Sequence, residues 1–404
     1  MQTRTPSNQM EKRSKVLLFL GSGVSLDSGI PNVKELTERV FDIRPDELKA
    51  VHPFCPSYSP LSNEYKHRGA QEFLKIVHEY AVSHGLEDVN YEDLHSLCTK
   101  IEKYRFAPRK DPTSRPMVEF VHGRISTTNF YKAQGNNLQI CAGTAREFID
   151  YTIKQELLFP KRKPENLDCI LEYIERLGPK NCDVITLNHD TLVEQLLANR
   201  NDWTDGFNES EIVYYEEASG QRVSQKIDYI SEESLMSAAK VRLIKPHGSC
   251  NWYNLKRSND WKWGIPRSGW RETLTDSANQ PISENPFDAG LLSGSLTKEW
   301  SYIFGPTALM FRNAYRILQE YDRVICSGYG WKDHGINRML IEWIQQNGEK
   351  RIAILESEKS ENFPNIQRLS QQWTAGSLSR TIIHPYWLSE ADPSTILELL
   401  NVGK

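Results

Sequence analysis

Paired cysteines are missing from this chain. Its 404 residues include seven cysteines, which are scattered and form no C-x-x-C pair. Zinc ribbons and dithiol redox sites need such pairs, so the sequence supports neither, and we expect no bound metal. Unpaired thiols in odd number are typical of a reducing compartment, which favours a cytoplasmic location.

Long apolar runs and excess charge are missing as well. No apolar stretch approaches the ~18 residues of a membrane span, and the first residues are polar, so we expect a mobile tail over 1–14 rather than a signal peptide. A net charge of −4 gives no electrostatic reason for binding nucleic acid or a membrane surface. The composition is that of a globular chain long enough for two domains or one large domain with insertions.

What the chain does have, near its start, is an apolar run that breaks into glycines. Residues 16–20 predict a buried strand, and Gly21-Ser22-Gly23 predicts a sharp turn after it. Glycines let the backbone approach a ligand, and the N–H groups of a helix start favour phosphate. The loop lacks the Gly-Lys-Ser/Thr ending of a P-loop, and Leu26 stands where G-x-G-x-x-G needs its last glycine. We therefore expect a nucleotide-binding loop of another kind.

Four further short runs rich in β-branched residues predict strands at 182–188, 241–247, 322–328 and 351–357. Helical patterns follow the first, third and fourth of them, at 190–199, 335–347 and 364–373. This alternation predicts an α/β fold with a Rossmann-like parallel sheet, in which ligands bind at the carboxyl ends of the strands.

The rest of the chain shows helical periodicity at 71–81, 91–105, 148–157 and 167–177. We expect residues 35–164 to be a mainly helical insertion with a loop-rich stretch near 108–143. The tryptophan-rich stretch 252–300 has little periodicity, and we expect it to form long loops over the site.

Polar residues stand at the predicted strand ends, and each has a plain structural explanation. Asn188 and Asp190 suit a helix start, where such residues cap locally, and Asp333 suits a second helix start. A single histidine such as His247 is commonly a packed residue. Glu356 follows the last strand, where a carboxylate can bind the two hydroxyls of a ribose.

Taken together, these motifs resemble the fingerprints of the sirtuin family. The first loop resembles the sirtuin G-A-G-[IV]-S-x-x-[SA]-G-I-P, and two later segments match T-x-N-x-D and H-G. A glycine also stands where sirtuins have the first residue of their late G-T-S turn. The matching residues are Gly21, Ser22, Gly23, Val24, Ser25, Ser28, Gly29, Ile30, Pro31, Thr186, Asn188, Asp190, His247, Gly248 and Gly328.

The resemblance implies a sirtuin-type NAD-binding domain made of residues 15–34 and 165–404. It implies that Asn188 holds the nicotinamide ribose and the attacking water, and that His247 accepts a proton. Asp190 is expected beside the carboxamide, with His189 pointing away from the site. The other residues expected to bind NAD⁺ are Gly21, Ser22, Gly23, Ser25, Thr186, Gly328 and Glu356.

Departures from the family pattern indicate the subtype. Deacylase sirtuins carry two C-x-x-C pairs, which this chain lacks, and their P-D-F-R is replaced here by Pro31-Asn32-Val33-Lys34. The chain therefore resembles the bacterial sirtuin-like NADases of anti-phage defence, which degrade NAD⁺ and work in large assemblies, for example with a HerA-type ATPase. This implies a homo-oligomer with such a partner. A protein deacylase or ADP-ribosyltransferase, and a non-catalytic NAD sensor, remain as alternatives.

Overall fold

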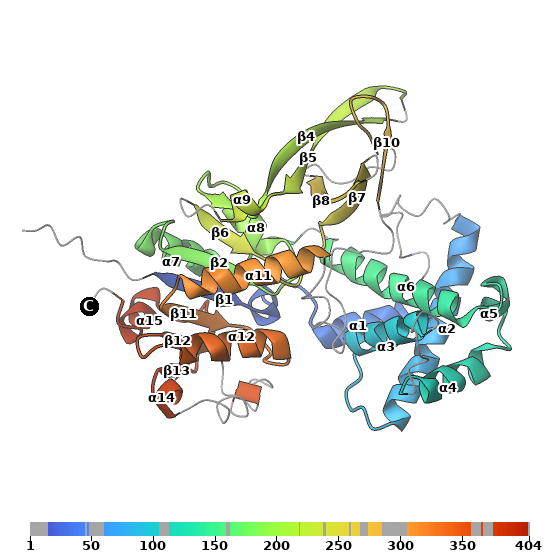
Figure 1. The fold of residues 1–404 in the computed structure, drawn as a ribbon, viewed down its shortest axis with the longest axis horizontal. Coiled ribbons are helices and arrows are strands. Elements are labelled where there is room, and N and C mark those ends of the chain that lie inside the picture. Colours follow the sequence, from blue (N-terminus) through green and yellow to red (C-terminus); the bar gives the residue numbers. More distant parts are fainter. Residues whose placement is uncertain are drawn as a thin grey trace, which may run out of the picture.

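A parallel sheet flanked by helices forms the left-hand part of the molecule in Figure 1, which shows a computed structural model. Its seven strands lie in the order β13-β12-β11-β1-β2-β6-β3, and all neighbouring pairs are parallel. This confirms the predicted α/β fold class. The strands are β1 (Val16–Leu20), β2 (Cys182–Thr186), β3 (Trp203–Thr204), β6 (Val241–Ile244), β11 (Arg323–Ser327), β12 (Arg351–Leu355) and β13 (Thr381–His384).

The structure describes residues 15–44, 47, 60–104, 113–158, 162–217, 219–236, 240–257, 260–266, 274–284, 305–356, 365–366 and 375–402. The predicted tail over 1–14 and nearly all of the predicted helix at 364–373 lie outside these residues. Within them, no helix is long and apolar enough to cross a membrane.

The buried strand β1 shows why the sheet has helices on both faces. All five of its residues are buried, and successive side chains of a strand point to opposite faces. Val16, Leu18 and Leu20 belong to one core with α7, α8 and α15, whereas Leu17 and Phe19 belong to a second core with α11 and α12. The helices outside the bundle described below are α7 (Asp168–Leu177), α8 (Leu192–Leu197), α9 (Glu232–Leu235), α11 (Gly305–Gln319), α12 (His334–Gln345), α14 (Ala375–Leu378) and α15 (Pro393–Leu399).

The order of the strands creates a switch point between β1 and β11. From β1 the chain builds the sheet towards β2 and β6, and it then returns to place β11, β12 and β13 on the other side. After β1 and after β11 the chain continues to helices whose buried residues belong to the two different cores, and such a point is where open α/β sheets bind ligands.

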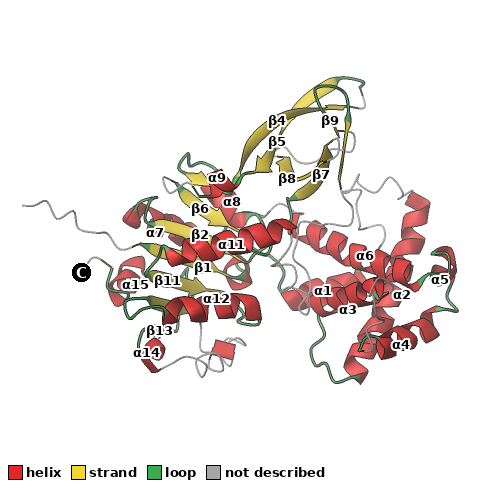
Figure 2. Ribbon diagram, in the orientation of Figure 1, coloured by secondary structure: helices red, strands yellow, loops and turns green. Residues whose placement is uncertain are grey.

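Six helices between β1 and β2 pack together beside the sheet (Figure 2). They are α1 (Val33–Asp42), α2 (Pro60–Ser83), α3 (Tyr91–Lys103), α4 (Arg115–Ile125), α5 (Asn129–Ala133) and α6 (Leu138–Leu158). The expectation of a loop-rich stretch near 108–143 is wrong for the described residues from 113 on, because α4, α5 and the start of α6 lie there. Met117, Val121 and Ile125 form a narrow buried stripe four residues apart on α4, which its polar residues obscured in the sequence.

A small antiparallel barrel stands above the sheet in Figure 1. It closes from two chain segments on either side of β6: β4 (Phe207–Glu216) and β5 (Arg222–Ile230), then β7 (Tyr253–Arg257), β8 (Asp260–Pro266), β9 (Leu274–Thr275) and β10 (Pro281–Glu284). The expectation of long loops over 252–300 is therefore wrong for its described part. Leu255 faces the core of the barrel, whereas Trp263 packs against the core that contains α11 and α12. Because large apolar residues lie on both faces of these strands, the sequence does not show the alternation of apolar and polar residues that predicts a strand.

Candidate functional site

The first predicted loop forms a short 3₁₀ turn, η1 (Ser22–Ser25), directly after β1. Its backbone touches the loop that follows β11. Gly21 N donates to Ser327 O and Gly23 N donates to Gly328 O, each at 2.9 Å. The backbone N–H of Gly23 is therefore already donated within the protein.

Three glycines at this contact leave no room for a side chain. A Cβ on Gly21 would lie 2.4 Å from Gly328 O, and one on Gly23 would lie 2.7 Å from Gly328 Cα. Gly328 itself has φ +66°, and its Cβ would lie 2.5 Å from Val24 N. Because these three residues have no side chain, the loops after β1 and β11 can lie in direct contact.

Asn188 lies at the carboxyl end of β2, next to the η1 turn. Its Nδ2 donates to Ser25 Oγ at 2.8 Å, and its backbone N donates to Thr186 Oγ1 at 3.2 Å. The side chain is only 4% exposed, yet Oδ1 has no hydrogen-bond partner among the described residues. A buried acceptor without a partner is costly. Asn188 is thus oriented by Ser25 with its amide oxygen available for a donor that the protein does not supply.

Asp190 takes the plain structural role considered for it. It is buried, and its Oδ1 accepts a hydrogen bond from Leu192 N at 2.9 Å, which supports the start of α8. Its backbone carbonyl accepts a hydrogen bond from Lys245. The turn at 188–190 is therefore tied to the chain that leaves β6.

Lys245, directly after β6, is a buried cation outside the motifs that resemble those of sirtuins. It is 2% exposed. Besides Asp190 O, its Nζ donates to Glu194 Oε1 at 2.8 Å and to Ser249 Oγ at 2.9 Å. Its position in the run 245–249, two residues before His247, was the available signal.

His247 is held by an acidic residue from the loop after β11. Its Nε2 lies 3.1 Å from Asp333 Oδ2, and both side chains are buried. The other oxygen, Asp333 Oδ1, accepts a hydrogen bond from Ile336 N at 3.0 Å and caps α12. Asp333 therefore serves as the predicted helix cap and also orients the imidazole.

The expectation that His189 points away from the site is wrong. Its ring lies 6.1 Å from the ring of His247, centroid to centroid. The main chain explains this, because His189 O accepts hydrogen bonds from Cys250 N at 2.8 Å and from Ser249 Oγ at 3.2 Å. These bonds hold residue 189 against the loop that carries His247.

The contacts described so far join four loops into a closed ring at the carboxyl edge of β11, β1, β2 and β6. Gly23 meets Gly328, Ser25 meets Asn188, Asp190 meets Lys245, and His247 meets Asp333. The structure thus brings together most of the predicted site residues. Ser22 is exposed on the first loop, and Glu356 is buried at the end of β12, where its N donates to His384 O at 3.1 Å, beside the ring rather than in it.

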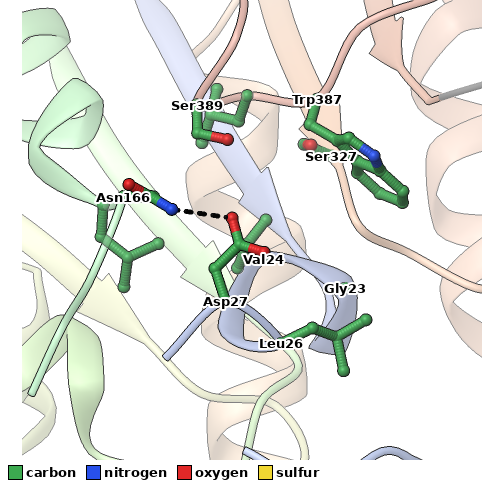
Figure 3. A pocket seen from close by; sticks show the side chains of 10 residues that line it. Gly23, Val24, Leu26, Asp27, Asn166, Ser327, Trp387 and Ser389 are labelled. Atoms are coloured by element: carbon green, nitrogen blue, oxygen red, sulfur yellow. Dashed lines mark hydrogen bonds between the residues drawn. The ribbon is translucent and has the colours of Figure 1, made fainter. Parts of the chain in front are cut away.

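The same edge is hollowed beside the η1 turn. Figure 3 shows the side chains around a cavity of about 150 Å³, with the Asp27–Asn166 hydrogen bond on one side and Trp387 on the other. Gly23 and Ser327 also line it. Small-molecule sites measure roughly 300–1,000 Å³, so this cavity is smaller than a typical ligand site.

The two buried thiols near this edge are unreactive, and the described side chains form no metal-binding cluster. Burial raises the pKa of Cys250 to about 12 and that of Cys326 well above its usual range, so both thiols are neutral and poor nucleophiles. In the part of the chain that the structure describes, no group of three or more His, Cys, Asp or Glu side chains is arranged to hold a metal ion.

Comparison with known proteins gives only distant similarity. No protein-family model and no curated protein matches the chain. Similar solved structures are sirtuins, including a Sir2 homologue in complex with NAD (11% identity, TM-score 0.39, 96% of this chain and 89% of that one). Others are an ADP-ribose complex of a Sir2 homologue (12%, 0.38, 96% and 92%) and Sir2Tm bound to a propionylated peptide (12%, 0.36, 97% and 95%). At such values the similarity carries no argument about the site, and the fold class stands on the sheet topology.

Proposed function

We propose that this chain is a sirtuin-like NAD⁺ hydrolase, which cleaves the bond between nicotinamide and ribose to give nicotinamide and ADP-ribose. The observation that carries the proposal is the buried amide of Asn188, fixed by Ser25 with Oδ1 lacking a partner. Asn188 follows β2, next to the switch point, and its side chain contacts the loop that leaves β1, where the sirtuin-like motifs come together. A ribose hydroxyl or a water molecule is the kind of donor that would satisfy it.

The reaction that we propose needs orientation and charge stabilisation more than a strong nucleophile. The bond from ribose C1′ to nicotinamide breaks, its electron pair leaves with nicotinamide, and C1′ becomes oxocarbenium-like. A water oxygen then bonds to C1′ and loses a proton. Asn188 orients the ribose and this water, while His247, held by Asp333, accepts the proton.

The remaining site residues bind the rest of the substrate in this proposal. The Ser22 backbone lies next to the phosphates, and Gly23 lines the cavity beside it. Asp190 lies beside the nicotinamide carboxamide. Glu356 binds the adenosine ribose. Gly21, Ser25, Thr186 and Gly328 hold the loops that form the binding surface.

We further propose that the biological role is NAD⁺ depletion in bacterial anti-phage defence, in the cytoplasm. An unrestrained NADase would kill its own cell, so activity must depend on assembly. We expect a homo-oligomer, with a HerA-type ATPase or another defence protein as partner. The proposed insertion at 35–164, which holds most of the helical bundle of α1–α6, and the tryptophan-rich stretch 252–300 are the surfaces that we propose for these contacts. Light scattering after gel filtration should then give a mass above the 46.6 kDa of one chain.

Incubation with NAD⁺ alone tests the enzymatic proposal. The full chain, with and without candidate partners, should release nicotinamide and ADP-ribose in equal amounts without an acyl-peptide or acceptor protein. Release that requires an acyl-lysine peptide or an ADP-ribose acceptor would replace hydrolysis by the deacylase or transferase alternative. Binding of NAD⁺ without turnover under every condition would leave the sensor alternative.

A further inference from the structure

The buried ammonium of Lys245 joins the two loops that carry Asn188 and His247. Lys245 lies two residues before His247, and the carbonyl that it binds belongs to Asp190, two residues after Asn188. We propose that Lys245 is a positioning residue, which sets the distance between the Asn188 turn and the His247 loop. Its consequence for turnover rests on the proposed NAD⁺ hydrolysis, whereas its consequence for loop geometry does not.

Lys245 makes more hydrogen bonds than are needed to balance its charge. A lysine ammonium has three N–H donors, and here they go to Glu194 Oε1 at 2.8 Å, to Ser249 Oγ at 2.9 Å and to Asp190 O. A buried cation needs a carboxylate to balance its charge, and Glu194 supplies it. The other two bonds end on the site loops, one on each side.

These two bonds are continued by contacts between the loops themselves. Ser249 Oγ also donates to His189 O, and Cys250 N donates to the same carbonyl. Without the ammonium, Asp190 O loses a donor, and the contacts described here that remain between the two loops are the two hydrogen bonds to His189 O and the contact between the rings of His189 and His247. Because these are neutral and few, we expect the loops to separate and fluctuate.

The same strand offers a matched control. Arg242 on β6 is also 2% exposed, and its Nε donates to Asp183 Oδ2 on β2 at 2.7 Å. It also pairs with Glu320. Arg242 thus joins β6 to β2 as a buried cation, as Lys245 does, but within the strands rather than at the site loops.

Three full-length variants separate positioning from stability. Lys245→Met leaves the Glu194 carboxylate without its cation, and Arg242→Met leaves the Asp183 and Glu320 carboxylates without theirs, so both should unfold at lower denaturant concentration than the wild type. In Lys245→Met with Glu194→Leu no charge is left unpaired, and its midpoint should lie closer to the wild type than that of Lys245→Met.

We expect the rate of NAD⁺ hydrolysis to depend on the geometry of the two loops rather than on the free energy of unfolding. For folded protein, we expect kcat for NAD⁺ to fall about 100-fold in Lys245→Met and in the double variant, because small misplacements of reacting groups have effects of that size. We expect KM to change by less than about threefold, since the phosphates contact the first loop. Arg242→Met should keep kcat within about twofold of the wild type, although it is less stable.

Hydrogen exchange at backbone amides reports how firmly the two loops are held, and it does not require NAD⁺ hydrolysis. The backbone N–H groups of Leu192 and Cys250 report the two loops, because they donate to Asp190 Oδ1 and to His189 O. Both should exchange faster in the double variant than in the wild type and remain protected in Arg242→Met.

Wild-type kcat in the double variant, or unchanged exchange at Leu192 and Cys250, would overturn the positioning role. If the wild type itself hydrolyses no NAD⁺ with any partner, the proposed function fails, and exchange alone then decides on Lys245: faster exchange supports it and unchanged exchange refutes it.

Discussion

Replacing Asn188 by alanine separates the proposed chemistry from the stability of the fold. The change removes the hydrogen bond from Nδ2 to Ser25 Oγ, and a neutral hydrogen bond contributes about 1 kcal/mol to stability. It also removes Oδ1, a buried acceptor without a partner, which costs about 1–3 kcal/mol in the folded state. The bond from the backbone N of residue 188 to Thr186 Oγ1 stays.

These opposing effects nearly cancel, so we expect the free energy of unfolding to change by no more than about 1 kcal/mol, or a few degrees in Tm. Proteins are stable by about 5–15 kcal/mol, so the variant stays folded. In contrast, NAD⁺ turnover should fall about 100-fold or more, since the ribose and water lose the group that orients them. A 100-fold loss corresponds to about 2.7 kcal/mol in the activation barrier.

The assay is release of nicotinamide from NAD⁺, with the unfolding midpoint measured on the same samples. Asn313→Ala is the matched control, because Asn313 on α11 is fully buried, also has an unpartnered side-chain atom in the described structure, and lies outside the ring of loops. We expect the control to keep wild-type turnover. Wild-type turnover in a folded Asn188→Ala protein would refute the assignment of the site.

Three other perturbations test particular contacts. Gly21→Ala should lower the free energy of unfolding by about 1–3 kcal/mol and abolish NAD⁺ turnover, because its Cβ would clash with the backbone of the loop after β11. Gly348 has open space around it, so Gly348→Ala should match the wild type in both unfolding and turnover. Asp333→Asn keeps a good helix cap but interacts more weakly with His247 once that ring is protonated. We therefore expect kcat to fall at least about tenfold while the unfolding midpoint stays nearly unchanged. A kcat equal to that of the wild type would show that Asp333 serves only as a helix cap. Burial raises the pKa of Glu147 from 4.5 to about 7, so its favourable contribution to folding is complete below about pH 4.5 and is lost as the pH rises through 7. Glu147→Gln should therefore gain stability relative to the wild type at pH 8 and not at pH 4 in denaturant titrations, and a pH-independent difference would contradict the shift.

The sheet was predictable because its strands carry a local signal. Buried parallel strands are continuous apolar runs, and each of the runs at 182–188, 241–247, 322–328 and 351–357 contains a strand of the sheet. The barrel was not predictable in this way. Its strands come from both sides of β6, and the two segments join through the antiparallel pairs β5–β8 and β4–β9, between residues far apart in the sequence.

The candidate site was predictable in its members but not in its connections. Motif positions named Asn188 and His247, yet only the fold shows that Ser25 orients the first and Asp333 the second. Lys245 shows the limit most clearly, since a lysine in a sequence is usually an exposed charge. Its burial depends on three acceptors that come from other positions in the chain.

We propose that Asn188 Oδ1 is the unfilled acceptor of an NAD⁺ site at the carboxyl edge of the sheet. A crystal structure of the full chain with ADP-ribose would show whether this acceptor is used. We expect ADP-ribose across the η1 turn, with a hydroxyl of its terminal ribose, or a water bound to that ribose, donating to Asn188 Oδ1 within ~3.2 Å and His247 facing the same ribose. ADP-ribose bound elsewhere, or bound at this edge with Oδ1 still lacking a donor, would contradict it.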